Sequence, residues 1–232
     1  MELRGERKCT ACGERWSYYE TGDVACPTCG SVRSVGVGER AEHTGGAATL
    51  DLSGIQGLVD TEPVGKVGRR ASEQAAEYLR AAGFVDVGRL RPLSDTYLAA
   101  TELRRVGARL DRAMRVDEAE ELYFLKLLGG ADDNRRPGPS EVPDGLRGER
   151  GLAVAAAAEA YTSDLRRVYE EPTGELASAL SAVRTRRKRI EALNGEVDPR
   201  EAERVVRTLR DVYGYLAEND ETALARASER FK

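Results

Sequence analysis

Apolar residues recur at steps of three and four along most of the chain after residue 49, which is the spacing of one face of an α-helix. The pattern predicts helices over residues 63–82 and 122–128, and a longer one from about 94 to 114. A short turn or helix is expected at 53–60. The abundance of alanine, leucine, glutamate and arginine agrees with a largely helical fold.

The C-terminal part has the clearest helical pattern. It predicts helices over residues 152–171, 175–193 and 222–231, and one that begins at Asp198 with Pro199 at its first position. The helix over 175–193 and the one after Asp198 carry matching apolar stripes, so we expect them to pack as an antiparallel hairpin. The stripes are Leu176, Leu180, Val183 and Ile190 on the former, and Ala202, Val205, Leu209, Val212 and Leu216 on the latter.

The first forty residues have a different pattern, with short strand-like runs at 15–19 and 31–37 around a turn at 21–23. The expected fold is therefore a small N-terminal β module followed by a mainly α-helical body, a helical bundle that ends in the C-terminal hairpin. The expected divisions are the β module at 1–40, a linker at 41–62, and a helical lobe at 63–128. A proline-containing linker or long loop at 129–148 and a C-terminal helical lobe at 149–232 follow.

The chain has 232 residues and a formal net charge of −4. Charges this balanced give no overall basic field that would hold nucleic acid or anionic lipid, so only a local patch could do so. The longest apolar run, residues 152–158, is too short to cross a bilayer, and the charged start of the chain leaves no room for an apolar signal core. We expect a cytoplasmic protein without membrane contact.

All four cysteines fall in two Cys-x2-Cys-Gly sequences, Cys9 with Cys12 and Cys26 with Cys29. Such a turn can place two thiolates on one ion, and the following glycine suits the positive φ that closes it. The pattern predicts one four-cysteine metal site in a zinc ribbon whose folding requires the metal. Four protein ligands leave no open coordination position, so a zinc ion there would be structural. A single iron is the alternative.

The aromatic residues of the ribbon are Trp16, Tyr18 and Tyr19. Strand alternation places Trp16 and Tyr18 on one face and Tyr19 on the other. We expect Trp16 to cover the metal site or pack on the helical body. Tyr19 could stack on a base or contact a protein partner.

Five of the six residues from Arg184 to Arg189 are basic: Arg184, Arg186, Arg187, Lys188 and Arg189. They form a possible patch for nucleic acid or a partner. Helical geometry spreads them around the helix, and the facing helix carries Glu201, Glu203 and Asp211, so neutralisation across the hairpin is favoured.

Catalytic groups are scarce in this sequence. The only histidine, His43, lies in the Gly-rich stretch 36–46 and is expected to be a linker residue. Because every cysteine belongs to the metal pattern, Ser-His-Asp and Cys-His arrangements have little support. We expect no enzyme activity, and no small-molecule substrate is indicated.

Two resemblances concern the cysteine motifs. Cys9-Thr-Ala-Cys12-Gly13 and Cys26-Pro-Thr-Cys29-Gly30 resemble the half-motifs of rubredoxin, an iron electron carrier, although rubredoxins separate the pairs by a much longer segment. Together with residues 90–98 and 121–125, these motifs resemble zinc-ribbon proteins of salt-loving archaea, whose ribbon is of the transcription-factor-IIB type. This resemblance implies a metal module and a connection with transcription.

Three functions are therefore open at this point. The first is a non-enzymatic adaptor that binds partner proteins through the ribbon and the helical body. The second is a nucleic-acid-binding or transcription-associated factor that uses the basic patch. The third is a single-iron electron carrier.

Overall fold

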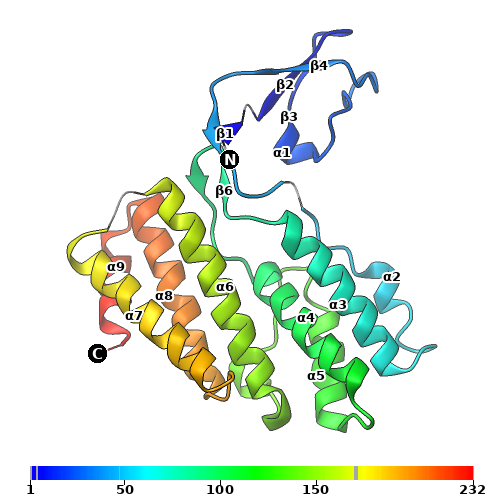
Figure 1. The fold of residues 1–232 in the computed structure, drawn as a ribbon, viewed down its shortest axis with the longest axis vertical. Helices are drawn as coiled ribbons and strands as arrows, with labels where there is room; N and C mark the ends of the chain where they lie inside the picture. Colours follow the sequence, from blue (N-terminus) through cyan, green and yellow to red (C-terminus); the bar gives the residue numbers. More distant parts are fainter. Residues whose placement is uncertain (1, 4, 47, 170–171, 232) are drawn as a thin grey trace.

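The computed structural model describes residues 2–3, 5–46, 48–169 and 172–231. Figure 1 shows a small β module at one end of a mostly helical body, with a narrow connection between them. This confirms the expected fold class. Residues 5–40 are called the ribbon below.

The ribbon contains a three-stranded antiparallel sheet in the order β3-β2-β4. The strands are β2 (Glu6–Cys9), β3 (Arg15–Ser17) and β4 (Ser34–Val37). The central strand β2 was not predicted, because its residues are charged and only Cys9 is buried. The strand expected at 15–19 ends at Ser17, where a short helix α1 (Tyr18–Thr21) begins. Trp16 and Tyr18 therefore do not share a strand face, contrary to the expectation.

The connection between ribbon and body, called the neck, is made of short paired strands. β1 (Glu2–Leu3) pairs with β5 (Ala41–Glu42), and β6 (Val85–Asp86) pairs with β7 (Arg89–Leu90) in a tight hairpin. In Figure 1, β1 and β6 lie between the ribbon and the helices.

His43 lies in the neck and is buried, with 4% of its surface exposed. Its Nδ1 accepts a hydrogen bond from the backbone N–H of Val87 at 3.2 Å and lies 3.3 Å from the Asp86 carboxylate. The next residue, Thr44, pairs its N–H with the carbonyl of Val85 at 3.1 Å and donates its hydroxyl to Asp164. The expectation of a linker position for His43 is therefore wrong, because the hairpin that buries it comes from a distant part of the chain.

The first helical group packs around one hydrophobic cluster that includes Leu52, Leu103, Phe124 and Leu127. Its helices are α2 (Ser53–Gln56), α3 (Val64–Ala81), α4 (Asp95–Arg112) and α5 (Glu118–Leu128). The hydroxyl of Ser94 caps α4 by accepting a hydrogen bond from the N–H of Tyr97.

The second helical group has its own hydrophobic cluster. Its helices are α6 (Arg147–Val168), α7 (Gly174–Ala192), α8 (Pro199–Glu218) and α9 (Glu221–Glu229). The helices α7 and α8 lie side by side as the expected hairpin (Figure 1), and Asp198 caps α8. No helix among the described residues is long and apolar enough to span a membrane.

Helix α6 begins five residues before the expected start at 152. Its first turns contain Gly148 and Gly151, which weaken a helical pattern in sequence. In the structure these glycines pack against the turn after α7. A Cβ atom on Gly151 would lie 2.2 Å from the carbonyl oxygen of Gly195, so only glycine allows this approach.

Both segments expected as linkers or loops pack against the body. Leu50 and Leu52 from 41–62 are buried, as are Val142 and Leu146 from 129–148. The second segment contains two short 3₁₀ helices, η1 (Pro139–Glu141) and η2 (Asp144–Leu146).

A buried ion network joins the two helical groups. Arg150 on α6 is 1% exposed, and its guanidinium lies 2.6 Å from Glu102 on α4 and 3.3 Å from Glu203 on α8. Tyr123 on α5 donates its hydroxyl to Glu102. Arg136, from the segment between α5 and α6, lies 2.6 Å from the same Glu203 carboxylate.

Burial disfavours the charged forms of the residues in this network, whereas ionic partners favour them, and the balance sets the pKa of each residue. Burial lowers the pKa of Arg136. It also disfavours the charge on Arg150, but the carboxylates, Glu102 foremost, outweigh it and hold the pKa of Arg150 above its usual value. Burial raises the pKa of Tyr123, so its hydroxyl stays protonated and donates. The network is stable only when it is complete.

The first prediction concerns this network. Replacing Arg150 by methionine will lower the free energy of unfolding by about 3–5 kcal/mol, because Glu102 and Glu203 lose a buried counter-charge. Urea unfolding followed by circular dichroism measures this change. The matched control is Arg105→Met, which removes a partly exposed pair with Glu149 at 3.1 Å and should cost about 1 kcal/mol or less. Equal losses in the two variants would contradict the role of the network.

The second prediction concerns pH. Burial lowers the pKa of His43 from its ordinary 6.5, against the opposing effect of Asp86. Below about pH 6.5 the unfolded chain binds a proton that the folded chain does not, so this contribution to stability is present above that pH and is lost as pH falls. We expect His43→Gln to show a shallower decrease in unfolding free energy than the unchanged protein between about pH 7.5 and 5.5. Identical slopes in urea unfolding would exclude this role of His43.

Candidate metal centre

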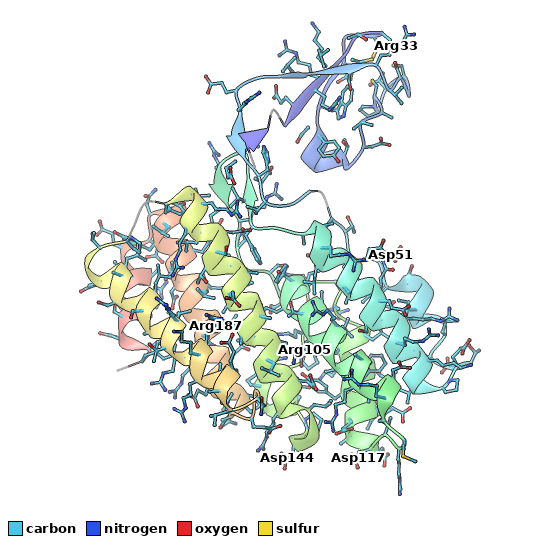
Figure 2. All side chains as sticks on the ribbon, in the orientation of Figure 1. Arg33, Asp51, Arg105, Asp117, Asp144 and Arg187 are labelled. Carbon is cyan, nitrogen blue, oxygen red and sulfur yellow. The ribbon has the colours of Figure 1, made fainter. Side chains whose placement is uncertain are left out.

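The four cysteine side chains converge at the end of the ribbon away from the helical body. Figure 2 shows sulfur beside the labelled Arg33 at this end. The four Sγ atoms all lie within 4.8 Å of one another, with 3.6 Å between Cys9 and Cys29 and 3.5 Å between Cys12 and Cys26. A disulfide would need about 2.05 Å. Thiolates about 2.3 Å from a central ion would be about 3.8 Å apart at the corners of a tetrahedron, so the observed spacing fits a single ion.

The two cysteine pairs have the same backbone geometry. In the first, the N–H of Gly13 donates to the carbonyl of Cys9 at 3.1 Å, and in the second the N–H of Gly30 donates to the carbonyl of Cys26 at 2.8 Å. Both glycines have positive φ, 81° and 69°. This is the turn expected after each Cys-x2-Cys pair, and a residue with a side chain would be strained there.

The sheet brings the two pairs together. Cys9 ends β2 and is paired with Ser34 of β4, while the N–H of Thr10 donates to the carbonyl of Arg33 at 3.0 Å. The second pair lies just before β4 in sequence, so the β2–β4 ladder determines the distance between the pairs. The unpredicted strand β2 is thus the element on which the site is built.

Trp16 packs in a small cluster with the buried Cys9 and Cys26. Its Nε1 donates to the carbonyl of Asp23 at 3.2 Å. Of the two expected positions for Trp16, the structure shows the one beside the cysteines. Asp23 was missed as a structural residue of the site, although its carboxylate also accepts from the N–H of Ala25 at 2.9 Å. The sequence could have indicated this role, because an aspartate often accepts a hydrogen bond from the N–H two residues later in an Asx turn.

The thiols differ in their acidity. Hydrogen bonds, foremost from the backbone N–H of Cys12, lower the pKa of Cys9 to about 6. The backbone N–H of Glu14 lowers the pKa of Cys12, but hydrogen bonding with Cys29 and burial outweigh it and raise the value to about 12. The pKa of Cys29 is also raised. Metal ligands are thiolates, so an ion that binds here displaces protons from Cys12 and Cys29.

Three of the five residues of the basic patch pair with carboxylates of the described chain. Arg186 and Arg189 both pair with Glu201, at 3.3 and 3.4 Å. Arg187, labelled in Figure 2, pairs with Glu159 on α6 and with Glu191. Of the described patch residues, Arg184 and Lys188 make no ion pair with the described part of the chain.

Neutralisation across the hairpin therefore involves one of the three expected carboxylates. Glu203 belongs to the buried network, and Asp211 pairs with Arg226 and Arg230 of the C-terminal segment. Tyr19 lies on α1, and its side chain is outside the described part of the structure.

The third prediction concerns metal removal. A chelator will unfold the ribbon and leave the helical body folded, because the ribbon buries little besides Cys9, Trp16 and Cys26, while the body has two large hydrophobic clusters. Amide resonances of residues 5–40 should lose dispersion while helical circular dichroism persists, and re-addition of the metal should restore them.

The matched variants for this experiment are neighbours in the second pair. Cys29→Ser should reproduce the effect of the chelator, whereas Thr28→Ala, an exposed residue of the same turn, should not. A ribbon whose resonances are unchanged after the metal is removed would show that the four cysteines do not stabilise it through an ion.

The comparisons with known proteins give one match. The model of a family described as "Family of unknown function (DUF7117)" matches residues 1–231. No curated protein and no solved structure matches the chain.

Proposed function

Since the chain belongs to this family of unknown function (DUF7117), we propose its function from its own structure: a non-enzymatic adaptor whose four-cysteine site holds one structural zinc ion. The ribbon would present one docking surface for a partner protein, and the helical body a second.

The choice of zinc rests on the ligands and their spacing. Four thiolates at the observed separations suit zinc or a single iron. The short segment between the pairs, residues 13–25, favours zinc over the rubredoxin type of iron site. All four ligands come from the chain, which leaves no position for a substrate on the ion. A colourless protein with one zinc per chain would agree with this, and a coloured one would indicate iron.

The proposal of an adaptor function rests on exposed apolar side chains of the ribbon. Val24, Val32 and Val35 are exposed to 44%, 72% and 50%. Val35 lies in β4, an edge strand of the sheet in the described part of the chain, and Val32 comes shortly before it. The hydroxyl of Ser34 in β4 donates to the carbonyl of Val24. A contiguous exposed apolar patch is typical of a surface that binds another protein, and we propose that these three valines belong to one. We call these three valines the valine surface.

Two further observations support a function without catalysis. Every cysteine is at the metal centre, and the only histidine is buried in the neck against Asp86 and Val87. Neither residue type is then available as a nucleophile or base at an open site.

Nucleic-acid binding is the second candidate, because Arg184 and Lys188 keep unpaired charges within the described part of α7. The carboxylates that pair with Arg186, Arg187 and Arg189 weaken this candidate. The connection with transcription that the sequence resemblance implies remains a prediction.

The fourth prediction tests the adaptor function. The test is a pull-down from a nuclease-treated extract of the native host. Partner proteins should bind the unchanged protein and be lost with Val32→Asp, because burying a carboxylate in the interface costs free energy. Mass spectrometry identifies and quantifies the bound proteins. The matched control is Leu122→Asp, which places the same charge on an exposed apolar residue of α5, 60% exposed and outside the ribbon.

Three results would contradict the proposal. Partners that disappear with nuclease would favour the nucleic-acid function, and partners that Val32→Asp still binds as well as the unchanged protein would show that the valine surface is not the docking surface. Substrate turnover that a point mutation abolishes would exclude a non-enzymatic adaptor.

A further inference from the structure

The surface between α6 and α7 contains a groove that the proposed function does not use. One hollow of about 570 Å³ is lined by residues of both helices, with Leu165, Leu180 and Val183 among its apolar members. A second hollow of about 610 Å³ adjoins it and shares Arg166, Leu180 and Arg184 with the first. Volumes of this size are typical of sites for small molecules.

Two arginines that line this groove, one on each helix, form no ion pair with the described part of the chain. Arg166 on α6 and Arg184 on α7 line both hollows. Within the described part of the chain, neither makes an ion pair or a hydrogen bond through its side chain. The neighbouring Arg187, by contrast, is paired with Glu159 at 3.1 Å and with Glu191 at 2.6 Å. Among the described residues, these two positive charges where the hollows meet therefore have no ion-pair partner.

Like charges on facing helices repel each other, and their field is focused because the groove is concave and partly apolar. A guanidinium matches the geometry of phosphate oxygens, with which it forms two parallel hydrogen bonds. Two guanidinium groups match the double negative charge of a phosphate group. The hydroxyl of Ser163 in the same hollow adds a further hydrogen-bond donor, whereas Leu180 and Val183 beneath it are buried in the core.

From these observations we infer that the groove between α6 and α7 binds a small phosphate-bearing molecule through Arg166 and Arg184. The arrangement suits a compact ligand better than a nucleic-acid strand. A strand needs a continuous basic track, whereas Arg186 and Arg189 are engaged by Glu201 of α8.

The test uses the full chain with its metal and inorganic pyrophosphate as the probe. Titration calorimetry should show binding, and amide shifts should concentrate in residues 159–167 and 180–187. Arg166→Gln and Arg184→Gln should each raise the dissociation constant by about tenfold, since each removes charge-assisted hydrogen bonds. The matched control is Arg112→Gln, an exposed arginine at the end of α4, which should leave the constant unchanged.

Three outcomes would overturn the inference. The first is the absence of pyrophosphate binding even at millimolar concentration. Arg112→Gln could weaken binding as much as Arg166→Gln, which would mean attraction by overall charge alone. A single-stranded oligonucleotide could bind more tightly than pyrophosphate and depend on the same arginines, which would assign the groove to nucleic acid. Circular dichroism of each variant shows whether the fold is retained. A negative result for this groove would leave the adaptor proposal unaffected, because the two concern different surfaces.

Discussion

The contact of Arg150 with Glu102 and Glu203 is the interaction on which the helical body depends. It joins α4, α6 and α8, and through Tyr123 and Arg136 it reaches α5 and the segment before α6. An ion in this position loses its hydration, so each member requires its partners in place. The network therefore links residues of four helices and the segment before α6 at one place in the body.

The ribbon depends on a different constraint. Its sheet buries little apolar surface, so an ion held by the four converging thiols would supply most of its stability. The neck then ties this module to the body through polar contacts, among them the hydroxyl of Thr44 with Asp164 and the Glu42–Arg167 pair at 3.1 Å. Both of these body residues lie on α6, the same helix that carries Arg150. Helix α6 therefore contacts the neck and also carries the central arginine of the buried network.

The two surfaces that we assign to binding lie on parts with different sources of stability. The valine surface belongs to the ribbon and would be lost with the metal. The groove with Arg166 and Arg184 belongs to helices that fold around their own core. Neither surface contains a residue of the metal centre or of the buried network, so each can be altered without removing what stabilises the fold.

Sequence alone determined the four-cysteine cluster, the helical body and the hairpin of α7 and α8, because Cys-x2-Cys-Gly spacing and apolar periodicity are local properties of the chain. The strand β2, the burial of His43, and the partners of Glu203 were decided by tertiary structure. Each depends on residues far apart in sequence: β2 on its ladder with β4, His43 on the hairpin of β6 and β7, and Glu203 on Arg136 and Arg150. A charged residue has the same local pattern whether it faces water or a buried partner, and only the packed fold distinguishes the two.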